Sequence, residues 1–107
     1  MIEKIIHVYY GKSINTSKYF TGNKWLLNNY EFIQWDDTKL IEFCKKNELP
    51  QNNMMLRTVC KLGGFFVDSN YQFFKSIDIF LDYNFLSVFD SNNNLKFYGS
   101  KKENQIL

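Results

Sequence analysis

Proline, arginine and histidine are almost absent from this chain, and cysteine is scarce. The 107 residues include one proline, Pro50, one arginine, Arg57, and one histidine, His7. The two cysteines, Cys44 and Cys60, lie far apart in apolar, helix-like stretches, so we expect two buried free thiols and no disulfide. They cannot form a zinc site by themselves, because the single histidine is distant in the sequence.

An excess of charge of one sign and a long apolar run are missing as well. The chain has 13 basic and 11 acidic residues, with a net charge of +2, which argues against a nucleic-acid-binding protein. No run approaches the roughly 18 apolar residues of a membrane helix. The N-terminal "MIEKIIHVYY" lacks the features of a signal peptide, so we expect a soluble, cytoplasmic protein.

Aromatic residues, in contrast, are abundant. Hydrophobic residues make up 45% of the chain and aromatic residues 19%, which excludes a disordered protein. A length of 107 residues suits one domain, residues 1–107. Aromatic side chains left at the surface of so small a domain would serve a ligand or a partner, and a homo-oligomer is one possibility.

The pattern of apolar residues predicts strands that alternate with helices. Strands are expected at 4–10, 31–35 and 65–67, with two more around an Asn-rich turn in 85–100. Helices are expected at 15–30, 36–47 and 53–62, and a short one at 75–83. The order β-α-β-α-α-β predicts an α/β fold with partly parallel pairing, in which ligands bind beyond the carboxyl ends of the strands.

Several residues should set the helix ends. Asp37 or Thr38 is expected to cap the helix at 36–47, and Asn52 or Asn53 the helix at 53–62. Residues 48–53, which include the only proline, form a break. Gly63 and Gly64 should end the second of these helices, because glycine adopts a left-handed cap conformation without a steric cost.

Asp68 and Asn70 form the first candidate site, directly after the strand at 65–67. On an extended backbone, residues two positions apart point the same way, so their carboxylate and amide oxygens could hold Mg²⁺ or Mn²⁺. Such an ion would neutralise a diphosphate. The alternative is an ordinary strand-end turn, since Asp, Ser and Asn are common turn residues.

The other candidates also have two interpretations each. Arg57 could contact phosphate or sugar oxygens, or form a surface ion pair. His7 could be a catalytic or a structural histidine, and Tyr10 could stack on a base or pack in the core. The aspartates of "WDD", which begins at Trp35, indicate a helix start more than a second metal site.

Taken in order, "KIIHVYYGK", "YEFIQWDD" and "MMLRTVCKLGGFFVDSNYQFFKSID" resemble the DXD-motif sugar-binding domain of glycosyltransferase family 32. The resemblance covers roughly residues 2–100 and is most specific from Arg57 to Asp68. It implies a GT-A-like, Rossmann-related nucleotide-sugar-binding fold, in a minimal version that lacks the acceptor half. It also implies Mn²⁺ or Mg²⁺ as cofactor, a UDP- or GDP-sugar as donor, a glycan as acceptor, and retention of configuration.

The resemblance assigns roles residue by residue. Asp68 and Asn70 fall on the two aspartates of the DXD motif and would hold the metal ion, and Asp68 and Arg57 would act in catalysis. The nucleotide-sugar contacts implied by the matching positions are His7, Tyr9, Tyr10, Trp35, Arg57 and Asp68.

The sequence departs from the family pattern at Asn70 and at Met54. Asn70 stands in place of an aspartate, which removes one negative charge from the metal site and weakens coordination. Met54 stands in place of the aspartate three residues before Arg57, and a thioether cannot orient a sugar hydroxyl. Three functions therefore remain open: a metal-dependent hexosyltransferase, a degenerate, non-catalytic protein that binds a nucleotide sugar or a partner, and an unrelated small α/β binding module.

Overall fold

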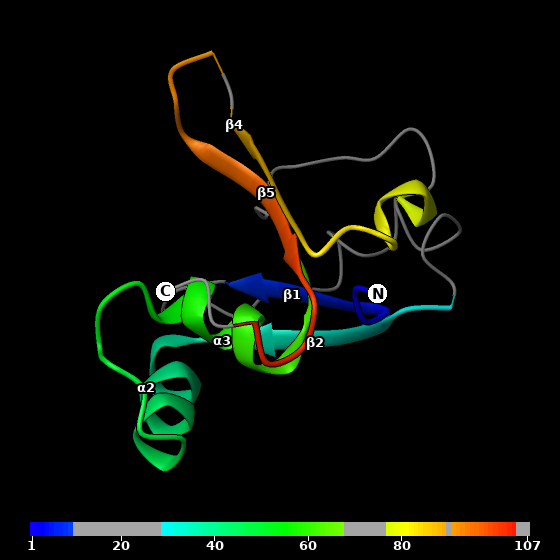
Figure 1. Cartoon of the computed structure of the whole chain (residues 1–107). Coiled ribbons are helices and arrows are strands. Elements are labelled where there is room, and N and C mark those ends of the chain that lie inside the picture. Colours follow the sequence, from blue (N-terminus) through cyan, green and yellow to red (C-terminus); the bar gives the residue numbers. More distant parts are fainter. Residues whose placement is uncertain (10–28, 68–76, 90, 105–107) are drawn as a thin grey trace.

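The computed structural model describes residues 1–9, 29–67, 77–89 and 91–104. The helix expected at 15–30 lies outside these ranges except for its last two residues. Within them the chain forms an α/β fold (Figure 1), with these elements in order: β1 (Ile5–Tyr9), β2 (Glu31–Trp35), α2 (Asp37–Lys46), α3 (Met54–Leu62), β3 (Gly64–Val67), the 3-10 helix η2 (Asp78–Phe80), β4 (Phe85–Phe89) and β5 (Leu95–Ser100).

The five strands form one mixed sheet in the order β2-β1-β3-β5-β4. β1 lies parallel to β2 on one side and to β3 on the other, as the alternation of strands and helices predicts. The β4–β5 hairpin, which the Asn-rich turn predicts, continues the sheet in the antiparallel sense. Because the chain leaves β1 toward β2 and then crosses to β3, the carboxyl ends of β1 and β3 lie side by side at a change of direction.

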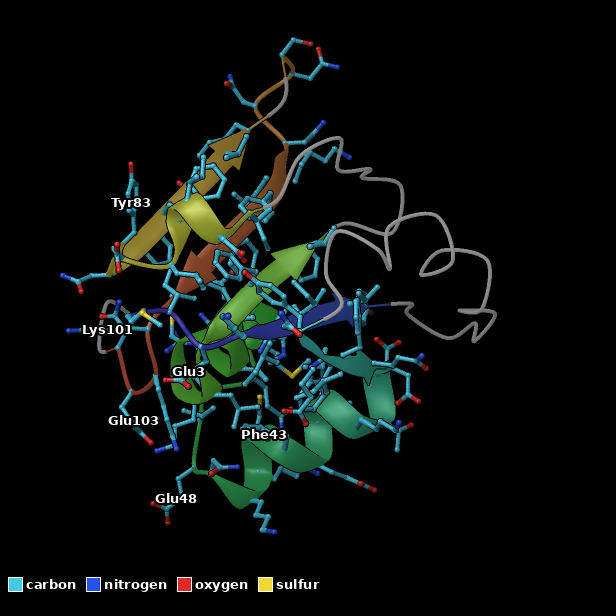
Figure 2. The ribbon with its side chains drawn as sticks, turned by 90° about the vertical axis from the view of Figure 1, so that its right-hand side faces the viewer. Glu3, Phe43, Glu48, Tyr83, Lys101 and Glu103 are labelled. Carbon is cyan, nitrogen blue, oxygen red and sulfur yellow. The ribbon has the colours of Figure 1, made fainter. Side chains whose placement is uncertain are left out.

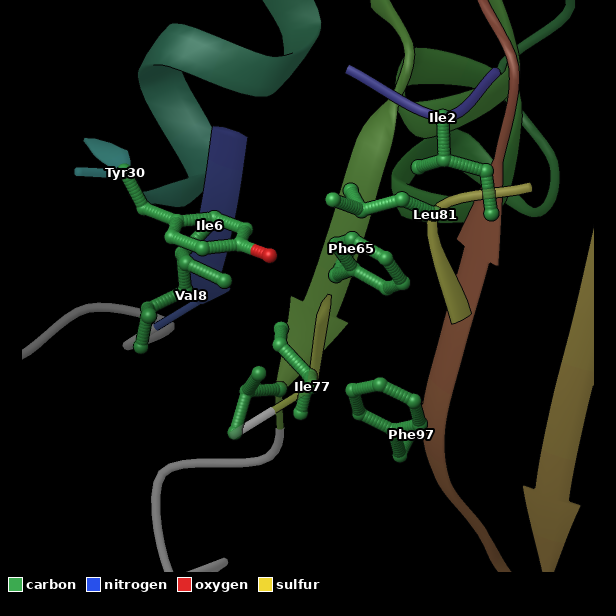
Figure 3. Packing of buried hydrophobic residues seen from close by; sticks show 9 residues of the cluster. Ile2, Ile6, Val8, Tyr30, Phe65, Ile77, Leu81 and Phe97 are labelled. Carbon is green, nitrogen blue, oxygen red and sulfur yellow. The ribbon is translucent and has the colours of Figure 1, made fainter. Parts of the chain in front are cut away.

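One face of the sheet carries the main hydrophobic core. Alternate residues of β1 and β3 point into it, and segment 77–81 covers them from outside (Figure 3). Phe65 stacks on Phe97 with ring centroids 5.6 Å apart, and Tyr30 packs against Phe65 at 6.3 Å. The buried residues of this cluster are Ile2, Ile6, Val8, Tyr30, Phe65, Val67, Ile77, Leu81 and Phe97.

The helices α2 and α3 pack on the opposite face. Figure 1 shows both helices on the same side of β1 and β2, with the β4–β5 hairpin extending away from them. Leu40 and Cys44 of α2, and Val59 and Cys60 of α3, are buried there. Both cysteines are free and buried, as expected from the sequence. Burial raises the pKa of the Cys60 thiol, which keeps it protonated and unreactive.

The predicted helix ends are confirmed in part. Asp36 is the N-cap of α2, because its carboxylate accepts a hydrogen bond from the Lys39 N–H at 2.8 Å. The predicted caps Asp37 and Thr38 are therefore wrong by one or two residues, since both already belong to the helix. Asn53 is the N-cap residue of α3, but its side chain makes no capping hydrogen bond.

Two glycines link α3 to β3, and both need a positive φ. Gly63 ends the helix with φ +80° and ψ 166°, which is a positive-φ extended conformation and not the left-handed cap expected from the sequence. Gly64 follows with φ +111°, and a Cβ there would lie 2.6 Å from the Ile5 carbonyl oxygen. This close approach to β1 excludes any larger residue.

The short helix expected at 75–83 is confirmed in part, within the described residues 77–83. Only Asp78–Phe80 is helical, as a single 3-10 turn. Ile77 and Leu81 are buried in the core on either side of this turn.

Candidate functional site

A pocket opens at the edge of the sheet where β1 ends. Its volume is about 350 Å³, and it lies on the helix-covered face of the sheet. The carboxyl end of β1, the first turn of α2, the first turn of α3 and strand β5 all contribute to it. The lining residues are Tyr9, Asp37, Leu40, Asn53, Met54, Met55, Leu56, Leu95 and Tyr98. This is the edge at which the sequence predicts a ligand.

Tyr9 and Asp37 form the polar part of this pocket. The Tyr9 hydroxyl donates a hydrogen bond to a carboxylate oxygen of Asp37. The parallel register of β1 and β2 explains the contact, because it pairs Tyr9 with Trp35, two residues before Asp37. This hydrogen bond, with smaller contributions from burial and from the negative charge of Asp37, raises the pKa of Tyr9. The pair therefore presents a carboxylate acceptor and a protonated phenol.

The start of α3 forms a second polar feature of the pocket. The first backbone hydrogen bond of this helix runs from the Arg57 N–H to the Asn53 carbonyl oxygen, at 3.0 Å. The N–H groups of Met54, Met55 and Leu56 precede that bond, and the side chain of Asn53 does not cap them. Uncapped N–H groups and the helix dipole favour an anion at such a helix start.

Most of the remaining lining is apolar, and Tyr98 adds an aromatic ring with a hydroxyl. Leu40, Met55, Leu56 and Leu95 present aliphatic or thioether groups. Met54, which stands in place of a carboxylate in the family pattern, is one of the lining residues as well. Within the described residues this pocket therefore combines one carboxylate, one helix start and an apolar wall.

His7 lies behind the pocket and not in it. Its side chain is fully buried, its Nε2 donates to the Gly63 carbonyl oxygen at 2.8 Å, and its Nδ1 accepts from the Trp35 Nε1–H at 3.0 Å. Burial lowers the pKa of His7 to about 4, although the hydrogen bond to Gly63 opposes this shift. The histidine is therefore neutral, with its proton on Nε2. This arrangement favours the structural interpretation of His7 over direct contact with a ligand.

Trp35 is in contact with His7. The two rings stack with centroids 6.2 Å apart, and Phe43 packs edge-on against the indole at 5.4 Å. Trp35 also lines a shallower hollow of about 600 Å³ between β2 and α2, with Lys39, Glu42 and Lys46 at its rim. Tyr9 and Trp35, both expected to contact the same nucleotide sugar, therefore face different hollows.

Arg57 is half-buried in the first turns of α3. Its Nε donates to the Asn52 carbonyl oxygen at 2.8 Å, just before the helix. It is not among the residues that line the pocket, and the only ion pair between described residues joins Lys61 and Glu103. The surface ion pair expected for Arg57 as an alternative is thus not formed within the described part of the chain.

The remaining predicted site residues, Tyr10, Asp68 and Asn70, lie outside the described residues. Among the described residues, no group of three or more histidine, cysteine or acidic side chains could hold a metal ion. The aspartates of "WDD" act as a helix start, as the sequence indicates. The sequence did not predict Asp37 as a hydrogen-bond partner of Tyr9. Asp37 lies two residues after the expected strand at 31–35, and parallel pairing of that strand with the first strand would have brought it near Tyr9.

The chain matches no family model, no curated protein and no solved structure. In the described ranges, no helix has both the length and the apolar character needed to cross a membrane.

Proposed function

We propose that the pocket between β1, α2 and α3 binds a nucleotide-diphosphate sugar, and that the protein is a metal-dependent glycosyltransferase with a GT-A-like, Rossmann-related fold. The observation that carries this proposal is the pocket itself. It lies at the carboxyl end of β1, where the strand order reverses, and it is lined by the first residues of α3, whose N–H groups the Asn53 side chain does not cap. This combination suits a ligand with phosphate, hydroxyl and apolar parts.

Each part of the pocket has a matching part in such a ligand. The N–H groups at Met54, Met55 and Leu56 suit a phosphate oxygen. The Asp37 carboxylate accepts hydrogen bonds, so it suits ribose or sugar hydroxyls. Leu40 and Leu95 offer an apolar surface to the face of a base or a sugar ring.

The metal ion in this proposal belongs to Asp68 and Asn70, which follow β3 in the sequence. A carboxylate and an amide oxygen are suitable donors for Mn²⁺ or Mg²⁺, and such ions keep several water or phosphate ligands. When bound, the ion would neutralise the charge that develops on the diphosphate leaving group. The resemblance to family 32 supports the assignment of Asp68 and Arg57 to the reaction, with a glycan as acceptor.

A second function, binding without turnover, is favoured by the composition of the pocket. Asp37 is its only carboxylate among the described residues, and the Tyr9 hydroxyl already occupies one of its oxygens. Met54 adds a thioether at the position where the family has a second carboxylate, and a thioether cannot orient a sugar hydroxyl. A pocket of this kind can hold a nucleotide sugar and still lack a group that assists transfer.

Titration calorimetry tests the proposal. UDP, GDP and their hexose conjugates are titrated into the protein with Mn²⁺ and then with EDTA, for the wild type, Asp68→Ala and Asp37→Asn. Asp82→Ala, at an exposed aspartate outside the pocket, is the matched control. We expect binding that needs the metal, is lost in Asp68→Ala, falls roughly threefold to tenfold in Asp37→Asn and is unchanged in Asp82→Ala.

The same titrations can contradict the proposal. Absence of binding to every nucleotide by a folded protein would exclude a nucleotide-sugar site. Binding that Asp37→Asn leaves unchanged would place the ligand elsewhere. If binding is confirmed, release of free hexose or transfer to a glycan separates the transferase from the non-catalytic binder.

A further inference from the structure

Exposed apolar side chains gather in one segment, residues 79–89. Five large hydrophobic residues are exposed in the described part of the chain, and Met1 is the only one outside this segment. The other four are Ile79 (74% exposed), Tyr83 (52%), Val88 (38%) and Phe89 (56%). Figure 2 shows Tyr83 beside the start of β4, pointing outward from the sheet. Concentrated apolar exposure of this kind marks an interaction surface.

Strand β4 is the edge of the sheet within this segment. Among the described residues it pairs only with β5, at the end of the sheet opposite β2 (Figure 2). Its five residues, Phe85–Phe89, include no charged residue and no proline. Natural edge strands usually carry such residues to prevent pairing with another chain, so β4 has no protection of this kind in its own sequence.

The sequence of β4 is nearly the same in both directions. Phe-Leu-Ser-Val-Phe has phenylalanine at both ends, an aliphatic residue at the second and fourth positions, and Ser87 at the centre. The register irregularity of the hairpin falls on β5, where Val88 pairs with Phe97 and Phe89 with Leu95. β4 itself therefore keeps the regular alternation of side chains that further pairing requires.

We propose that two copies of this chain form a symmetric dimer through antiparallel pairing of β4 with β4, centred on Ser87. In this register Phe89 of one copy lies opposite Phe85 of the other, and Val88 lies opposite Leu86. The exposed residues Val88 and Phe89 of each strand thus lie opposite the partly buried residues Phe85 and Leu86 of the other. Aromatic and aliphatic cross-strand pairs stabilise a sheet, and a two-fold axis satisfies both copies at once.

The available area indicates a weak dimer. The exposed parts of the four side chains and the outer edge of β4 offer roughly 500 Å² per copy, or about 1,000 Å² in total. This reaches the lower limit for a specific interface, so we expect a reversible dimer in the micromolar range of protein. The absence of charge on β4 means that no like charges within the two strands oppose the pairing.

Sedimentation velocity over a range of concentrations tests the dimer. The wild type should shift from 12.9 kDa toward twice this mass as the concentration rises. Val88→Lys should stay monomeric, because it places a charge opposite Leu86 of the partner, and Thr38→Lys on α2 should behave as the wild type. Circular dichroism should show that both variants are folded. A wild type that is monomeric throughout, a Val88→Lys protein that still dimerises, or open-ended aggregation would each overturn the proposal.

Cysteine cross-linking tests the register. The proposed axis places Ser87 opposite its own copy, with Cα atoms about 4.5–5.5 Å apart, within reach of a disulfide. Ser87→Cys should therefore give a covalent dimer under mild oxidation. Ser91→Cys, exposed but about four residues from the axis, should not, and the native Cys44 and Cys60 are buried. Equal cross-linking of both variants, or of neither, would overturn this register.

Discussion

The single histidine should make the stability of the protein depend on pH. His7 is fully buried, and its folded-state pKa is about 4, against an ordinary value of 6.5. Between these values the unfolded chain binds a proton that the folded chain excludes, so stability falls as the pH falls. The stability is fully present above pH 6.5, and its loss is complete only below pH 4.

The magnitude follows from the difference between the two pKa values. A shift of about 2.5 pKa units corresponds to about 3 kcal/mol, and about 2.5 kcal/mol of this is lost between pH 7 and pH 4.5. Among the described residues, the two hydrogen-bond partners of His7 are neutral groups, the Trp35 indole and the Gly63 carbonyl, so neither adds a charge that would offset the cost. Burial is the main cause of the shift.

Urea denaturation of the wild type and of His7→Gln between pH 7 and pH 4.5 measures how much His7 contributes to the pH dependence of the unfolding free energy. A glutamine amide can donate to Gly63 and accept from Trp35, but it does not titrate. Carboxylates that titrate in the same range affect both proteins alike, so the difference in unfolding free energy between them should shrink by about 2.5 kcal/mol from pH 7 to pH 4.5. Parallel stability curves would refute the buried, neutral histidine.

The histidine signal in NMR gives a second measurement that does not need the variant. Because His7 is the only histidine, its ring resonance is unambiguous, and it should not begin to titrate until the pH falls well below 6. An ordinary midpoint near 6.5 in the folded protein would contradict the hydrogen bonds assigned to both ring nitrogens.

Three further outcomes are expected. Gly64→Ala should destabilise the protein by about 2 kcal/mol or more in urea, because its Cβ would meet a backbone oxygen at 2.6 Å and φ is +111°. Cys44 and Cys60 should react with a thiol reagent only after unfolding, and fast reaction of the native protein would contradict their burial. Tyr9→Phe should change the free energy of unfolding by less than about 1 kcal/mol. The ultraviolet titration of the wild type should contain a tyrosine signal that this variant lacks. The midpoint of that signal should lie above pH 10, because Asp37 accepts a hydrogen bond from the Tyr9 hydroxyl and raises the pKa of Tyr9.

Much of the fold could be predicted from the sequence because it depends on local pattern. The apolar stretch at 31–35 is a strand within the predicted bounds, and Gly63 ends a helix where the sequence places the end. Helix caps were harder, since Asp36 and Asp37 are adjacent and only the hydrogen bond to Lys39 distinguishes them. The short helix expected at 75–83 is only a 3-10 turn at 78–80 among the described residues, and the burial of Ile77 and Leu81 on either side of it is a tertiary contact that no local pattern specifies.

The candidate site was predictable only in its location. The carboxyl end of β1 follows from the order of strands and helices, and the pocket beside Tyr9 lies there. The contact between Tyr9 and Asp37 depends on the register of two strands, which no local pattern specifies. The metal-binding assignment of Asp68 and Asn70 stays a prediction from sequence, since both lie outside the described residues.

His7 connects the stability of the fold to the candidate site. Its two hydrogen bonds join the centre of β1 to Trp35 at the end of β2 and to Gly63 before β3, so one side chain ties together the three parallel strands. Tyr9 lies two residues further along β1, and Asp37 two residues beyond Trp35. The relative position of the polar pair in the pocket is therefore set by the same network. The buried His7 is in this way a positioning residue, and a change at His7 should weaken the Tyr9–Asp37 contact, seen as a Tyr9 pKa closer to its ordinary value of 10, before it unfolds the sheet.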